Sequence, residues 1–77
     1  MAYEKLRGKL LQGTRLTYRD VRAVLKYLGY KLARQKGSHE QWVKAGKTFT
    51  LACHSKEVPF YILDTIKKMV KEHEKSG

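Results

Sequence analysis

Apolar residues recur at helical spacing in three segments of the chain, and the first of these covers residues 3–11. Its apolar positions are Tyr3, Leu6, Leu10 and Leu11, and Gly13 follows as a stop signal. This pattern predicts a short additional helix packed on the domain. A frayed basic arm is the alternative interpretation of the same residues.

The second segment carries the clearest signal for the start of a helix. Thr17 is followed three residues later by Asp20, which is close to a capping box. The apolar positions that follow at helical intervals are Val21, Val24, Leu25 and Leu28. Gly29 supplies the C-terminal stop. We expect this helix to bury its apolar face against a sheet and to leave Arg19, Arg22 and Lys26 in solvent.

After Gly29 the period changes to that of strands. Residues 30–36, 39–44 and 47–53 are predicted as three short strands. Tight turns at Gly37-Ser38 and Ala45-Gly46 join them, which implies an antiparallel meander.

The third helical segment follows a polar loop over residues 54–58, and Pro59 suits its first turn. We expect this helix to run from about residue 60 to beyond residue 70. Its apolar stripe consists of Ile62, Leu63, Ile66, Met69 and Val70. Residues 71–77 are mostly charged and are expected to fray.

These elements predict an α+β fold of two layers, α-β-β-β-α, with a three-stranded antiparallel sheet covered on one face by two helices. The other face of the sheet is left open. We divide the chain into an N-terminal extension (residues 1–15), the main domain (residues 16–72) and a charged tail (residues 73–77).

The balance of charged residues indicates a polyanionic partner. Lys and Arg number 17 against 7 Asp and Glu, which gives a formal net charge of +10. Such a field concentrates polyanions, so nucleic acid is the leading partner, ahead of an anionic membrane or an acidic protein. A chain of 77 residues has a thin core. We therefore expect any chemistry on an open surface rather than in a deep cavity.

The cysteine and histidine content narrows the class of protein further. Cys53 is the only cysteine, so no intramolecular disulfide can form, which is typical of a reducing cytoplasm. No apolar run approaches the ~20 residues of a membrane span. His39, His54 and His73 show no zinc-binding spacing. We expect a cytoplasmic protein with no metal, no cofactor and no membrane partner.

The segment from Leu28 to Trp42 carries a family resemblance. Gly29-Tyr30, the run Arg34-Gln35-Lys36-Gly37-Ser38-His39 and Trp42 closely resemble the signature of the HicA family, the toxin components of bacterial and archaeal toxin–antitoxin pairs. The resemblance extends over about residues 16–70.

This resemblance implies a fold similar to double-stranded-RNA-binding domains and metal-independent cleavage of mRNA. It implies that His39, the histidine of the Gly-Ser-His motif, is the catalytic residue. It also implies neutralisation by a HicB antitoxin that covers the same face. Members often carry another histidine at the end of the third strand, where His54 stands. The loop from His54 to Pro59 is short and poor in glycine, which departs from the family pattern.

The chemistry of the central run agrees with this assignment. An imidazole exchanges protons near neutral pH, and RNA supplies its own nucleophile, the 2′-hydroxyl. Arg34 and Lys36 share one side of the first strand and are expected to bind phosphate. Gly37 and Ser38 form the turn and can offer donors to phosphate. Each residue also has a structural interpretation, as a solvated edge or an ordinary hairpin turn.

Other candidates stay open at this point. Trp42 could stack on a base or lie in the core, whereas Tyr30 is expected in the core. His54 could be an auxiliary proton-transfer group, a phosphate donor or a plain loop residue. Cys53 is expected in or near the core. His73 is expected on a solvated surface.

Three functions fit the residues. The first is a toxin endoribonuclease that uses His39, and the second is a non-catalytic RNA-binding module with a dsRBD-like fold. The third is an interaction protein whose basic face docks an acidic antitoxin. The intact Gly37-Ser38-His39 run favours the first, because a pure binder does not need the histidine.

Overall fold

The computed structural model describes residues 3–76 and shows three helices and a three-stranded sheet. In chain order the elements are α1 (Tyr3–Leu11), α2 (Tyr18–Tyr27), β1 (Lys31–Lys36), β2 (His39–Lys44), β3 (Lys47–Ala52) and α3 (Phe60–Ser76). The strands are antiparallel in the order β1-β2-β3. The α+β fold expected from the sequence is confirmed. Of the predicted tail, Gly77 lies outside the described residues.

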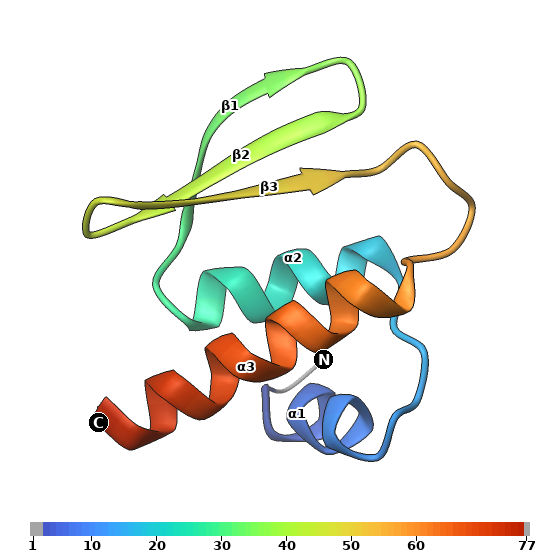
Figure 1. Cartoon of the computed structure of the whole chain (residues 1–77), viewed down its shortest axis with the longest axis vertical. Helices are drawn as coiled ribbons and strands as arrows, with labels where there is room; N and C mark the ends of the chain where they lie inside the picture. Colours follow the sequence, from blue (N-terminus) through green and yellow to red (C-terminus); the bar gives the residue numbers. More distant parts are fainter. Residues whose placement is uncertain (1–2, 77) are drawn as a thin grey trace.

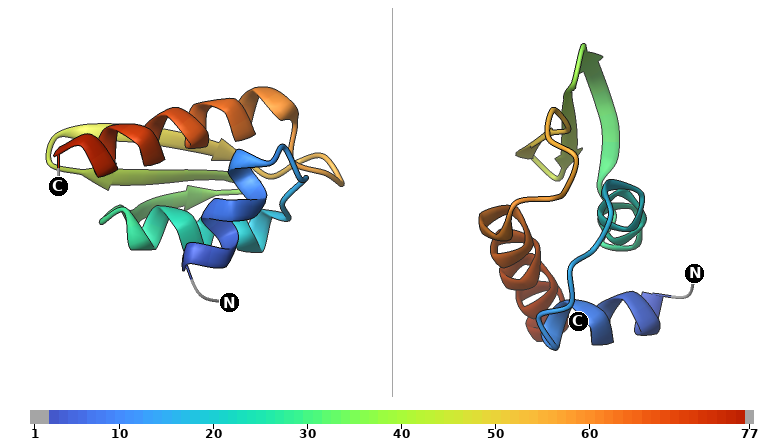
Figure 2. Two further views of the ribbon diagram at one scale, coloured as in Figure 1. Left: turned by 90° about the horizontal axis from the view of Figure 1, so that it is seen from below. Right: turned by 90° about the vertical axis from the view of Figure 1, so that its right-hand side faces the viewer.

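The elements stack in layers, as Figures 1 and 2 show. Helices α2 and α3 cover one face of the sheet, and α1 packs on the side of these helices that faces away from the sheet. The residues of α1 therefore form a helix rather than a frayed arm. Leu6 and Leu10 hold it in place, because both are buried in the core. The second face of the sheet remains uncovered.

Helix α2 begins as its sequence predicts. The Thr17 hydroxyl accepts a hydrogen bond from the Asp20 amide at 3.1 Å, and the Asp20 carboxylate accepts one from the Thr17 amide at 3.2 Å. This capping box satisfies two amides that the first turn would leave unpaired. Gly29, two residues beyond the last residue of the helix, stops it by adopting a φ of +95° in the left-handed region.

The core fills the space between the helices and the inner face of the sheet. Its largest fully buried side chain is Trp42, which β2 places against the helices. The other fully buried residues are Leu6, Leu16, Val21, Val24, Leu25, Leu28, Leu51, Val58, Ile66 and Val70. Tyr30, which directly precedes β1, is 9% exposed and lies in this core as expected.

Helix α3 continues to Ser76, so the expected fraying from Lys71 is wrong for the described part of the tail. Two contacts explain the difference. Val70 is fully buried, and Glu74 forms an ion pair with Arg7 of α1. The last turns of α3 are therefore tied to the N-terminal helix. Along residues 3–76, no helix has the length and apolar character needed to cross a membrane.

The strands match their predicted ranges except at two ends. Tyr30 lies just before β1, and Cys53 lies just after β3. The strand β1 also contains an irregularity that no sequence pattern announced. Its pairing with β2 shifts between Leu32 and Arg34, which leaves Ala33 as an extra residue, a β-bulge.

Candidate functional site

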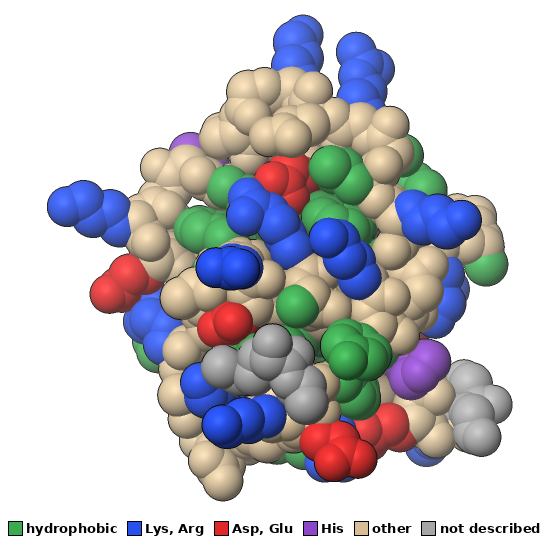
Figure 3. Space-filling model, turned by 180° about the vertical axis from the view of Figure 1, so that it is seen from behind, with side chains coloured by type: hydrophobic (Ala, Val, Ile, Leu, Met, Phe, Trp, Pro, Cys, Tyr) green, Lys and Arg blue, Asp and Glu red, His purple; other side chains and the backbone are tan. Residues whose placement is uncertain are grey.

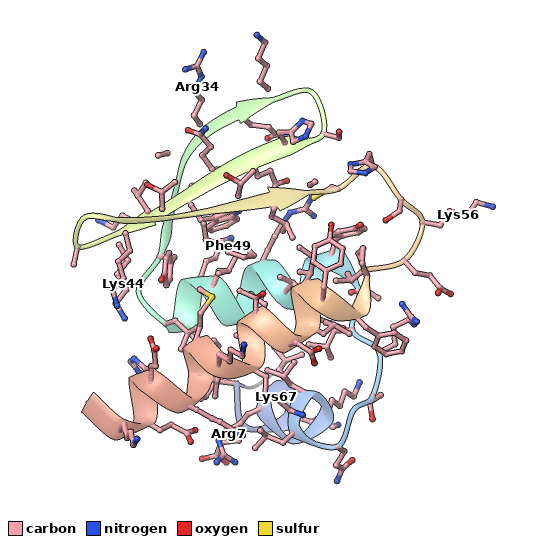
Figure 4. All side chains as sticks on the ribbon, in the orientation of Figure 1. Arg7, Arg34, Lys44, Phe49, Lys56 and Lys67 are labelled. Atoms are coloured by element: carbon pink, nitrogen blue, oxygen red, sulfur yellow. The ribbon has the colours of Figure 1, made fainter. Side chains whose placement is uncertain are left out.

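The two faces of the sheet differ in chemistry, and β2 shows the difference most clearly. His39, Gln41 and Val43 are exposed, whereas Glu40 and Trp42 between them are buried. Figure 4 shows the same division on the flanking strands, where Phe49 of β3 points toward the helices and Arg34 of β1 points away from them. His39 therefore belongs to the open face.

The β-bulge sets which residues of β1 join His39 there. Leu32 is opposite Trp42 and therefore on the inner face, so simple alternation would also turn Arg34 and Lys36 inward. The extra residue at Ala33 reverses the alternation. Arg34 then lies opposite Gln41, and Lys36 lies opposite His39. Directly opposite residues share a face, so both cations lie on the open face beside the histidine.

A shallow hollow of about 600 Å³ occupies this end of the open face. It is lined by Arg34, Lys36, Gly37, Ser38, His39 and Gln41. The structure thus brings together all five residues predicted for catalysis and phosphate binding. Gln41 was not predicted, although the two-residue period that starts at His39 points to it.

The β1–β2 turn is held close to the end of β3. Gly37 adopts a φ of +58°, in the left-handed region that side chains disfavour. The next residue, Ser38, accepts a hydrogen bond at its carbonyl from the Cys53 amide at 2.7 Å. This bond fixes the turn to the residue that precedes His54. It therefore sets the separation between the start of β2, which carries His39, and the segment after β3, which carries His54.

The imidazole rings of His39 and His54 lie near one another. Their centroids are 6.1 Å apart and their planes are inclined by 40°. Both side chains are exposed. His54, which the sequence left between an auxiliary role and a plain loop position, is therefore a neighbour of His39, which lines the hollow.

Trp42 lies on the opposite side of the sheet from the hollow, so it cannot stack on a base bound there. It is 1% exposed, and its indole nitrogen donates to Glu40 Oε1 at 3.1 Å. The structure thus places Trp42 in the core, one of the two positions left open by the sequence.

Glu40 anchors β2 to α2 beneath the site. Arg22 donates from Nε to both carboxylate oxygens at 3.0 Å and from Nη2 to Oε2 at 2.7 Å. The expectation that Arg22 stays in solvent is wrong, because its guanidinium pairs with this buried carboxylate. Arg22 lowers the pKa of Glu40 through these hydrogen bonds, against a smaller opposing effect of burial.

Cys53 adjoins the same pair on the inner side of the sheet. Its Sγ accepts a hydrogen bond from Arg22 Nη2 at 3.4 Å, and the residue is half-buried against the core. Burial raises the pKa of the Cys53 thiol. The thiol form is inert as a nucleophile, which agrees with a packing role for this residue.

Positive charge extends beyond the hollow. Lys and Arg side chains project widely over the face seen in Figure 3, where acidic side chains are fewer. At the β2–β3 turn, the ammonium nitrogen of Lys44 lies over the ring of Tyr30, 5.7 Å from the ring centroid. His73 is exposed near the end of α3. Within residues 3–76, His, Cys, Asp and Glu side chains do not gather in groups of three or more that could hold a metal ion.

Comparison with known families identifies the chain. The model of the family described as the HicA toxin of bacterial toxin–antitoxin systems matches residues 18–72, which is more than half of the 77 residues. No curated protein and no solved structure is significantly similar to the chain. The matched range contains every residue that lines the hollow, and it also contains His54. This chain belongs to the HicA toxin family.

Proposed function

We propose that this HicA-family toxin is a metal-independent mRNA endoribonuclease in which His39 transfers protons as a general acid or base. The observation that carries the proposal is the position of His39 in a cationic hollow on an uncovered sheet face, beside Arg34 and Lys36. The hollow is open, so an RNA strand can lie across it without any part of the fold moving aside.

The reaction needs little from the protein because the substrate supplies the nucleophile. The ribose 2′-oxygen attacks the adjacent phosphorus and loses its proton to a base, while the P–O5′ bond breaks and the 5′-oxygen gains a proton from an acid. The products are a 2′,3′-cyclic phosphate and a 5′-hydroxyl. An imidazole can serve in either transfer near neutral pH. The path requires no metal-bound water.

The neighbours of His39 suit the charge that develops on the phosphate. The Arg34 guanidinium can donate two parallel hydrogen bonds to phosphate oxygens, and the Lys36 ammonium acts as a point charge. Gly37 and Ser38 allow close approach of the backbone and add a hydroxyl donor. Fixed positive groups at a developing negative charge lower the barrier because they are already oriented.

The same face also suits an inhibitor, and we include a HicB-like antitoxin in the proposal. An acidic surface laid over Arg34 and Lys36 also covers His39, because the three side chains share one end of the open sheet face. Antitoxin binding and RNA binding are then mutually exclusive. The complex is expected to weaken with rising salt, since the contacts are between exposed charges.

The test is an RNA cleavage assay with purified protein in EDTA. Wild type should cut the RNA. His39→Ala should reduce the rate by about 100-fold or more and leave RNA binding nearly unchanged. The matched control is His73→Ala, which removes an exposed histidine of α3 and should cut at the wild-type rate.

Two results would overturn the proposal. RNA that stays intact at high wild-type concentration, yet binds with strong salt dependence, identifies the chain as a non-catalytic RNA-binding module. Cleavage by His39→Ala at the wild-type rate removes His39 from the chemistry. In either case, Lys36→Ala should still weaken RNA binding if the hollow is the contact surface.

A further inference from the structure

The neighbouring imidazoles of His39 and His54 come from two different elements. Ala52, the last residue of β3, lies opposite His39, the first residue of β2. The next residue, Cys53, turns its thiol toward Arg22 on the inner side of the sheet. His54 then returns to the outer side and places its ring centroid 6.1 Å from that of His39. Figure 1 shows the β1–β2 turn and the end of β3 on the same side of the molecule.

No packing requirement accounts for this pair. Both rings are exposed, so neither contributes to the core. Among residues 3–76, neither imidazole is hydrogen-bonded to another side chain. When both rings are protonated they repel each other, and Lys36 opposite His39 adds to that repulsion. An anion bound beside the two rings reverses the effect, which makes the pair suitable for a phosphate.

Cleavage of a phosphodiester by its own 2′-hydroxyl involves two proton transfers at different atoms. One proton leaves the attacking 2′-oxygen, and another reaches the departing 5′-oxygen on the far side of phosphorus. A single imidazole reaches one of these oxygens at a time. Two imidazoles at neighbouring positions can serve both oxygens in one passage through the transition state.

We infer that His54 is the second proton-transfer residue of this site, so that His39 and His54 act on one phosphodiester as a base–acid pair. The inference rests on the proposed endoribonuclease function. One imidazole takes the 2′ proton as the P–O2′ bond forms. The other, present as imidazolium, gives its proton to O5′ as the P–O5′ bond breaks. Exchange with water returns both rings to their starting forms.

The separation of the rings fixes where the phosphate lies. A centroid distance of 6.1 Å leaves no room for a phosphate directly between the rings. The phosphate must lie above them on the solvent side, where each ring can reach one oxygen at a hydrogen-bond length of about 3 Å. On that side Lys36 and Arg34 flank His39 and can bind the two non-bridging oxygens.

Few other charged groups face the pair. From β1 these are Lys36 and Arg34, whereas Glu40 of β2 and the thiol of Cys53 lie on the inner side of the sheet. Lys56 of the loop after β3 points away from the sheet (Figure 4). The pH dependence of the reaction is therefore expected to reflect the two imidazoles.

The decisive experiment compares two RNA oligonucleotides under single-turnover conditions. One is ordinary RNA, and the other carries sulfur in place of the bridging 5′-oxygen at one linkage. A thiolate leaves without a proton, so the sulfur substrate needs the base but not the acid. His39→Ala and His54→Ala should each lose about 100-fold or more on ordinary RNA. On the sulfur substrate, one variant alone should recover to within about tenfold of wild type, and that variant identifies the acid.

Several outcomes overturn the inference. They are cleavage of ordinary RNA by His54→Ala at the wild-type rate, rescue of both variants by sulfur, and rescue of neither. If His39→Ala is inactive while His54→Ala is fully active, the endoribonuclease stands and the pair fails. If wild type cuts neither substrate, the proposed function itself fails.

Two further readouts separate chemistry from structure. The wild-type rate should fall at both low and high pH, and each histidine variant should keep only one of the two limbs. A variant that keeps both limbs contradicts the assignment. The melting temperature of His54→Ala should match that of the control His73→Ala, because both residues are exposed. The control lies about 20 Å along α3 from the start of the helix, remote from the pair.

Discussion

The most informative perturbation of the scaffold is Arg22→Met, which removes a charge and keeps most of the side-chain volume. In the native protein, Glu40 is 3% exposed and accepts three hydrogen bonds from Arg22 and one from Trp42. The substitution leaves a buried carboxylate with the Trp42 indole N–H and the Cys53 thiol as its remaining side-chain donors.

The cost follows from the difference in burial between the partners. Breaking a buried ion pair by removing one member costs about 3–5 kcal/mol. Arg22 retains 38% side-chain exposure, so the pair is partly screened and we expect the lower end, about 3 kcal/mol. Glu40→Gln should cost less, about 1–1.5 kcal/mol, because the freed guanidinium can turn toward water. For a domain of this size, these figures correspond to melting temperatures lowered by roughly 12–24 °C and 4–12 °C.

The pH dependence supplies a qualitative signature. In wild type, Arg22 holds the pKa of Glu40 below its ordinary 4.5, so the native state binds this proton less readily than the unfolded state. That contribution to stability is present above pH 4.5 and is lost as the pH falls through the native pKa. In Arg22→Met, burial becomes the largest effect and raises the pKa of Glu40. The sign then reverses, and the variant loses stability as the pH rises from about 4.5 toward 7.

Urea unfolding followed by circular dichroism at pH 4 and pH 7 measures both effects. The destabilisation by Arg22→Met should be smaller at pH 4, where Glu40 can take up a proton. The control is Arg19→Met, the same substitution on an exposed position of the same helix. If the two variants have equal unfolding free energies, or if the destabilisation is the same at both pH values, the account of the Arg22–Glu40 pair is refuted.

Three further predictions test other parts of the fold. Trp42→Phe should cost about 1–3 kcal/mol in urea unfolding, because it removes the indole donor to Glu40 and leaves a smaller ring in the core; no change would contradict the contact. Leu6→Ala in α1 should cost about 2–5 kcal/mol, whereas Lys5→Ala on the exposed side should cost under about 0.5 kcal/mol; equal effects would mean that α1 is not packed on the domain. Ala45→Asn should stabilise the protein by roughly 0.5–1 kcal/mol, because Ala45 has a φ of +45° in a two-residue turn where Asn is favoured; a lower melting temperature would refute this.

The elements of the fold could be predicted because each is specified by residues close together in the chain. Thr17 and Asp20 cap α2 within one turn, and Gly29 ends it in the left-handed conformation. Turn residues at Gly37-Ser38 and Ala45-Gly46 separate three short strands, which fixes an antiparallel meander. Local chemistry of this kind does not depend on what packs against the element.

The errors concern contacts between residues far apart in the chain. Arg22 was expected in solvent because its helix has a polar face, but Glu40 lies 18 residues away and a strand brings it under that helix. The end of α3 was expected to fray because the tail is charged, yet Arg7 pairs with Glu74 across 67 residues. Burial of Trp42 became decidable only when the direction of β2 relative to the helices was known.

The site shows the same limit in a more instructive form. The run from Arg34 to His39 identified the hollow, but strict alternation from Leu32, which lies opposite the buried Trp42, would have turned Arg34 and Lys36 toward the helices. The bulge at Ala33 places them beside His39 instead. Backbone hydrogen bonding between β1 and β2 sets this bulge, and no residue type in the run specifies it. A cationic patch that depends on the β1–β2 register would be lost if the register changed, even though every one of its residues remained in the sequence.

The strand β2 therefore connects the stability of this small domain to its proposed chemistry. His39 on its outer face and Glu40 on its inner face are adjacent residues, so the bonds from Arg22 and Trp42 that hold Glu40 also hold the backbone from which His39 projects. On the other side, the bond from the Cys53 amide to the Ser38 carbonyl fixes the end of β3 against the turn and thereby places His54. A thin core can support the site because the proposed chemistry needs only two side chains at a set separation on an open surface. That separation is maintained from the inner side of the sheet, away from the outer face on which RNA and an antitoxin are proposed to bind.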